Sequence, residues 1–158
     1  MACPYFDPGE RLPGSSGSLG DLYRDQGRME EARAHCDQAL ATHRAVGNRR
    51  SEGAVLGSLG DLLARQGRLG EAREAFGAGE AILREVGDKL QLASLLCIRG
   101  RVEVAAGNLD VGRAALAAAA TLAVAMDAGP ESEVCREIAK LRDALARPEP
   151  DSRRGNAR

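Results

Sequence analysis

Hydrophobic positions in the middle of the chain recur at spacings of three and four residues. One such stretch contains, in order, Val55, Leu56, Leu59, Leu62 and Leu63. This spacing places the apolar side chains on one face of an α-helix and the intervening polar residues on the other. No stretch of the sequence shows the alternating pattern of a β-strand, so the pattern predicts an all-α protein.

Glycines follow these apolar stretches at regular intervals: Gly27, Gly47, Gly67, Gly87 and Gly107. Because a residue with positive φ commonly follows the last turn of a helix, each of these glycines is predicted to end a helix. Asn48 and Asp88 come directly after two of them, and their side-chain oxygens are predicted to cap the next helix. The helices are then about 16 to 17 residues long, or roughly 25 Å.

The sequence also repeats itself at an offset of 40 residues. Residues 18–22 and 58–62 are identical, and 15 of 33 positions match between 18–50 and 58–90. A fainter third copy keeps six residues in the same register: Gly100, Gly107, Leu109, Arg113, Ala115 and Ala118. A fixed period of this size is typical of stacked helical units that bury their apolar faces against their neighbours.

The predicted fold is therefore an α-solenoid of about three antiparallel helix pairs plus a C-terminal capping helix. The repeats are placed at 15–48, 49–88 and 89–128, here called repeats one, two and three. Pro130, Glu131 and Glu133 are typical of a helix start, which predicts the capping helix at 130–146. Its apolar stripe is predicted to consist of Val134, Ile138, Leu141 and Leu145, and its opposite, solvent-facing side is predicted to carry Glu133, Arg136, Glu137, Lys140 and Asp143. Residues 1–14 and 147–158 are expected to be disordered.

The beginning of repeat one is less regular than that of repeat two, because it has Pro13 and Gly14 where repeat two has Gly53 and Ala54. Either its first helix is frayed, or the chain is the C-terminal part of a longer array. An uncovered first repeat exposes an apolar face, so a homodimer through this repeat is a further expectation.

Repeat two carries Leu56-x2-Leu59-Gly60-x2-Leu63, followed by Ala72-x3-Phe76. Repeat one has Ser16-x2-Leu19-Gly20-x2-Tyr23, followed by Ala32-x3-Cys36, with Cys36 expected to be a buried, inert thiol. These motifs resemble the tetratricopeptide repeat over about residues 15–128. The long period is similar to that of the subgroup found in kinesin light chains, G-protein-signalling adaptors and bacterial regulators. Repeat three departs from the pattern at Arg99 and Glu103.

The resemblance implies a scaffold that holds a peptide in a concave groove formed by the first helix of each repeat. The groove positions carried over from the family are Ser18, Asp21, Arg24, Ser58, Asp61, Arg65 and Arg101. The two aspartates favour a peptide with a basic residue, and Arg101 is available for an acidic one. The same aspartates precede arginines by three or four residues, so a second interpretation is that they only support the helix surface.

Composition narrows the classes of function. The chain has 158 residues, 44% of them hydrophobic, a net charge of -1 and 3% aromatic residues. This composition argues against a disordered chain and against a nucleic-acid partner, which would need a basic surface or stacking aromatics. The longest uncharged run, 114–126, is too short for a membrane span of roughly 20 residues, so it predicts a buried helix. Without a secretory signal, a cytoplasmic location is expected.

Catalytic chemistry is not indicated. The four cysteines lie far apart in the sequence, and His35 and His43 are two helical turns from each other, so no metal site and no cofactor are expected. The favoured function is a protein-interaction scaffold that is not an enzyme. The alternative is a C-terminal regulatory or sensor fragment of a larger bacterial regulator or kinase.

Overall fold

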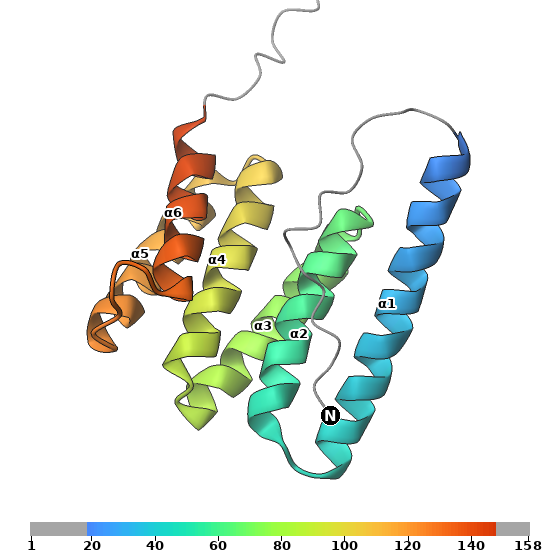
Figure 1. Cartoon of the computed structure of the whole chain (residues 1–158), viewed down its shortest axis with the longest axis horizontal. Coiled ribbons are helices and arrows are strands. Elements are labelled where there is room, and N and C mark those ends of the chain that lie inside the picture. Colours follow the sequence, from blue (N-terminus) through green and yellow to red (C-terminus); the bar gives the residue numbers. More distant parts are fainter. Residues whose placement is uncertain (1–18, 148–158) are drawn as a thin grey trace, which may run out of the picture.

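A computed structural model describes the backbone of residues 19–147 and the side chains of residues 27–147. This part of the chain contains only α-helices and turns (Figure 1). The helices are α1 (Leu19–Ala45), α2 (Arg49–Arg65), α3 (Leu69–Val86), α4 (Lys89–Ala105), α5 (Leu109–Ala125) and α6 (Glu133–Ala146). The all-α fold is therefore confirmed. Residues 1–14 and 148–158, for which disorder was expected, lie outside the described residues.

The helices stack in the order of the sequence, as in an α-solenoid. The most extensive contacts join α2 to α3 and α4 to α5, which are the helix pairs of repeats two and three. Helices α2, α4 and α6 follow one another along one face, and α3 and α5 lie behind them (Figure 1). None of the helices in the described part of the chain is long and apolar enough to cross a bilayer.

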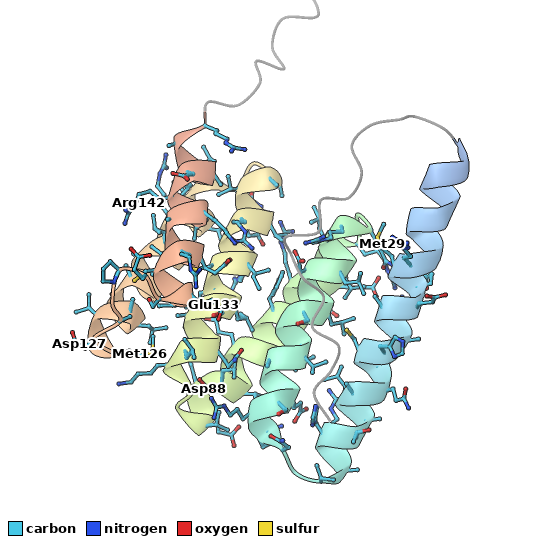
Figure 2. All side chains as sticks on the ribbon, in the orientation of Figure 1. Met29, Asp88, Met126, Asp127, Glu133 and Arg142 are labelled. Carbon is cyan, nitrogen blue, oxygen red and sulfur yellow. The ribbon has the colours of Figure 1, made fainter. Side chains whose placement is uncertain are left out.

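The predicted turns form as the glycines and caps suggested, with one exception. Gly47, Gly67, Gly87 and Gly107 all have positive φ, between 68° and 84°. The Asn48 side chain accepts a hydrogen bond from the backbone N–H of Ser51 at 3.1 Å. Asp88, labelled at the turn before α4 in Figure 2, accepts one from Gln91 N–H at 3.0 Å. These contacts satisfy backbone donors that the first turn of a helix leaves unpaired.

The exception is Gly27, which was predicted to end a helix. It lies instead inside α1, a single continuous helix of 27 residues. A glycine permits a left-handed turn but does not require one. The turn is favourable only where the helix that precedes the glycine buries apolar surface by folding back against the next helix. The sequence has Ser15 and Ser16 where repeat two has Val55 and Leu56, so a first helix of repeat one would bury less apolar area by turning back.

Because α1 continues through Gly27, Cys36 is also less buried than expected. It was expected to be a buried core residue, but it is half-buried, whereas Phe76 at the equivalent position of repeat two is completely buried. The difference follows from the straight course of α1, because residues 19–26 continue that helix and do not fold back over Cys36 as α2 folds over Phe76.

The capping helix α6 begins at Glu133, three residues later than the predicted start at Pro130. The Ser132 hydroxyl accepts a hydrogen bond from Cys135 N–H at 3.3 Å, so serine is the N-cap, and Pro130 lies in the turn before it. The predicted apolar stripe of α6 is confirmed, since Val134, Ile138 and Leu141 are buried. Contacts with α4 and α5 show that this stripe covers the end of the array.

Repeat three accommodates the two charged residues that break its apolar pattern. Arg99 replaces the leucine of repeat two and hydrogen-bonds to Glu80 of α3 at 2.5 Å. Glu103 is 3% exposed and accepts two hydrogen bonds from Arg73 of α3, at 2.8 and 2.9 Å. Between repeats one and two, the positions equivalent to Glu80 and Arg99 are Leu40 and Leu59, which pack in one hydrophobic cluster. Ion pairs thus replace apolar contacts at the second junction between repeats.

Candidate functional site

A groove with a volume of about 460 Å³ lies where α2 and α4 end and α3 begins. Its apolar lining comes from Ala64, Leu69, Val102, Ala105 and Ala106. Its charged lining comes from Asp61, Arg65 and Arg101. The groove therefore joins repeats two and three, on the side of the array where the first helices of these repeats contact each other.

The structure brings together three of the seven residues predicted for the groove, namely Asp61, Arg65 and Arg101. Ser58 lies on α2 outside the groove, is exposed, and donates its hydroxyl hydrogen to the backbone carbonyl of Ala54 at 3.4 Å. Asp21 and Arg24 belong to α1, but their side chains lie outside the described residues, as does all of Ser18.

Asp61 and Arg65 form an ion pair of 2.8 Å one turn apart on α2. Their side chains are 29% and 39% exposed, so both remain in contact with solvent at the groove wall. A pair of this kind supports a helix by only about 0.3–0.5 kcal/mol, because water screens it. Asp61 therefore contributes little to folding, and a ligand group that replaces Arg65 as its partner has little stability to overcome.

Arg101 was expected to be available for an acidic ligand, but it forms an ion pair with Glu137 of α6. Lys140 also pairs with Glu137, at 2.6 Å. Burial opposes ionisation of Glu137, but hydrogen bonds from Lys140 and Arg101 outweigh it and hold the pKa of Glu137 below its ordinary value. An acidic ligand must therefore compete with a buried carboxylate for Arg101.

Sequence reasoning placed Glu137 and Lys140 on the solvent face of α6 and missed their role beside the groove. Glu137 lies 36 residues after Arg101 in the sequence, close to the spacing of the repeats. Its side chain is only 15% exposed. The spacing alone did not identify the pair, because only the placement of α6 against α4 brings Glu137 beside Arg101.

Glu103 fixes the end of α4 that forms one wall of the groove. Besides the two hydrogen bonds from Arg73, it accepts one from the side chain of Asn108 at 2.7 Å. The hydrogen bonds from Arg73 hold the pKa of Glu103 below its ordinary value against the opposing effect of burial, with a smaller contribution from Asn108. This carboxylate is therefore charged at neutral pH and ties α4 to α3.

The described residues contain no group of three or more His, Cys, Asp or Glu side chains placed to hold a metal ion. The groove wall combines small apolar side chains with charges that already have partners. A concave wall that is mostly apolar and carries a few charged groups is a common form of binding surface.

The fold and the groove define a helical-repeat protein built from stacked helix pairs. Residues 15–85 match the family model described as tetratricopeptide repeat, so this part of the chain is similar to that family. Repeats of this family generally mediate protein–protein interaction. No curated protein and no solved structure matches the chain. Membership of the long-helix subgroup stays a prediction.

Proposed function

We propose that this protein is an interaction scaffold and that it binds a segment of a protein partner in the groove between α2 and α4. The observation that carries the proposal is the groove itself, which joins Asp61 and Arg65 of repeat two to Arg101 of repeat three around an apolar wall. Stacked helical repeats commonly bind partners in surfaces of this kind, because each repeat adds one strip of side chains to a continuous face.

The partner segment is proposed to insert an apolar side chain between Ala64 and Ala105 and to place polar groups toward Asp61 and Arg65. Desolvation of the apolar wall provides most of the binding free energy, since the charges of the groove are already paired. The Asp61 carboxylate is more accessible than that of Glu137. The partner segment is therefore proposed to carry a basic residue next to its apolar side chain. Arg101 would accept an acidic group only at the expense of its contact with Glu137.

Selection from a library of random peptides tests the proposal, because it does not require the natural partner. Peptides selected on the wild-type chain are then measured by fluorescence polarisation against two variants, Ala105→Arg and Ala125→Arg. Both residues are exposed alanines at the last position of a helix, α4 and α5 respectively, but only Ala105 lines the groove. The two substitutions therefore have the same effect on charge and nearly the same effect on helix stability.

Ala105→Arg is expected to weaken binding of the selected peptides at least tenfold, or about 1.4 kcal/mol, because the long side chain fills the groove. Ala125→Arg is expected to leave binding unchanged. Asp61→Arg should weaken the binding of peptides that contain a basic residue more than the binding of peptides that lack one. Equal affinity for the wild type and Ala105→Arg would show that the groove is not the binding site.

The groove lies on α2, α3 and α4, so the proposed function does not require the homodimer expected through the N-terminal repeat. Ser18, Asp21, Arg24 and Ser58 remain proposed contacts for a partner that extends beyond the groove. The regulatory role within a larger bacterial protein and the cytoplasmic location likewise remain predictions.

A further inference from the structure

The carboxylate of Glu137 on α6 joins two cations through its two oxygen atoms. Oε2 accepts a hydrogen bond from Nη1 of Arg101 on α4, and Oε1 accepts one from Nζ of Lys140, about one turn further along α6, at 2.6 Å. The Glu137 side chain is 15% exposed, whereas those of Arg101 and Lys140 are 30% and 55% exposed. The carboxylate is therefore the most enclosed of the three groups, and it lies directly beside the groove residue Arg101.

The pair formed by Arg101 and Glu137 lies close to the hydrophobic core. Helix α6 packs onto α4 (Figure 1), and Cys97 of α4 is completely buried there. Burial and, to a smaller extent, the charge of Glu137 raise the pKa of the Cys97 thiol to about 11, and Arg101 opposes this rise. Because water screens charges near a protein interior less than it screens exposed ones, the attraction between Arg101 and Glu137 is stronger than that within the more exposed pair Asp61–Arg65.

Arg101 cannot bind an acidic group of a partner without affecting Glu137. A guanidinium has five N–H donors, and Glu137 accepts a hydrogen bond from Nη1 of Arg101. An acidic group that takes this donor must break the existing ion pair and leave Glu137 to Lys140. An acidic group that uses another donor lies close to the Glu137 carboxylate, and the two negative charges repel each other. In both cases the binding of an acidic ligand is weakened.

We propose that Glu137 determines which charge the groove accepts in a bound segment. Its carboxylate takes the place of an acidic ligand on Arg101, so the groove excludes segments with an acidic residue at that place and leaves Asp61 to a basic one. The inference rests on the proposed function, and it adds a residue of α6 that does not line the groove. Without the charge of Glu137, the same groove is expected to bind segments with an acidic residue opposite Arg101.

A purely structural role for Glu137 predicts a different result. The ion pair with Arg101 joins α4 to α6, so its loss lowers the free energy of unfolding whether or not Glu137 influences the ligand. A change in stability therefore does not separate the two roles. The charge of the peptides that bind does separate them, because a residue that only holds α6 in place has no effect on the choice between an acidic and a neutral side chain.

Parallel selections from one library of random peptides test the inference. The library is selected on the wild-type chain, on Glu137→Gln, on Asp143→Asn, and on the double variant Arg101→Gln/Glu137→Gln. Asp143 is exposed on α6 and does not line the groove, so Asp143→Asn is a control that removes the same charge from the same helix. The double variant removes both charges of the pair. Circular dichroism of each variant verifies that the helices are retained.

Peptides selected on Glu137→Gln are expected to contain more Asp and Glu than those selected on the wild type or on Asp143→Asn. Measured by fluorescence polarisation, these acidic peptides should bind the wild type about tenfold more weakly than they bind Glu137→Gln. The enrichment should be absent from peptides selected on the double variant, because it requires the guanidinium of Arg101.

Two results would overturn the inference alone. Equal acidic content in the peptides selected on Glu137→Gln and on Asp143→Asn would show that Glu137 only supports helix packing. Enrichment that persists in the double variant would show that a cation other than Arg101 receives the acidic residue. In both cases Ala105→Arg would still weaken binding of the selected peptides. If Ala105→Arg left their affinity unchanged, the proposed function would fail, and this inference would fail with it.

Discussion

Substitution of Gly79 by alanine is the sharpest test of how the helix pair of repeat two packs. Gly79 lies in the interior of α3 where it crosses α2. An added Cβ atom would lie 2.9 Å from the backbone carbonyl oxygen of Gly53 and 3.1 Å from Cβ of Leu56. Neither atom is moved by rotating a side chain, so the two helices themselves must separate.

The expected effect is the difference between two terms. Overpacking in a well-packed interior costs about 1–3 kcal/mol, and a clash with backbone belongs at the upper end. Replacing glycine by alanine inside a helix returns about 1 kcal/mol. The Gly79→Ala variant should therefore lose about 2 kcal/mol of unfolding free energy.

Gly77→Ala is the matched control, because Gly77 lies two residues away on the exposed side of α3 and a Cβ atom there meets nothing within 4 Å. This variant should gain about 0.5–1 kcal/mol from helix propensity alone. Urea unfolding followed by circular dichroism at 222 nm measures both. If the two variants change stability in the same direction and by the same amount, α2 and α3 do not approach each other as closely as described.

The two ion-pair junctions between α3 and α4 give the remaining predictions. The pKa of Glu103 is lowered by Arg73 from the reference value of 4.5, so its stabilisation is complete above pH 4.5 and is lost as the pH falls through the lowered pKa. Urea unfolding at a series of pH values should therefore show less acid sensitivity in Glu103→Gln than in the wild type, and equal sensitivity would contradict this role. Arg99→Leu should lower the free energy of unfolding by about 3 kcal/mol, because it breaks a buried ion pair. This value is at the lower end of the range for such a change, since Glu80 still has Arg84 as a partner. Adding Glu80→Leu should recover most of that loss by restoring the apolar contact used between repeats one and two, and a double variant no more stable than Arg99→Leu would refute the equivalence of the two junctions.

Several features of this protein follow from local sequence alone. The caps by Asn48 and Asp88 were predictable, because each depends on a hydrogen bond between residues a few positions apart. The apolar stripe of α6 was predictable for a similar reason, since helical periodicity alone decides which residues share a face. The repeat offset then predicted the order in which the helices stack.

Other features were decided only by the tertiary structure. Gln26-Gly27-Arg28 and Gln66-Gly67-Arg68 are identical in sequence, yet the first continues a helix and the second ends one. A local sequence permits both conformations, and the packing area available to the preceding helix selects between them. The partner of Arg101 depended in the same way on the placement of α6, which periodicity does not encode. Interactions within one turn of backbone are specified by neighbouring residues, whereas contacts between distant helices depend on the combined geometry of all the helices between them.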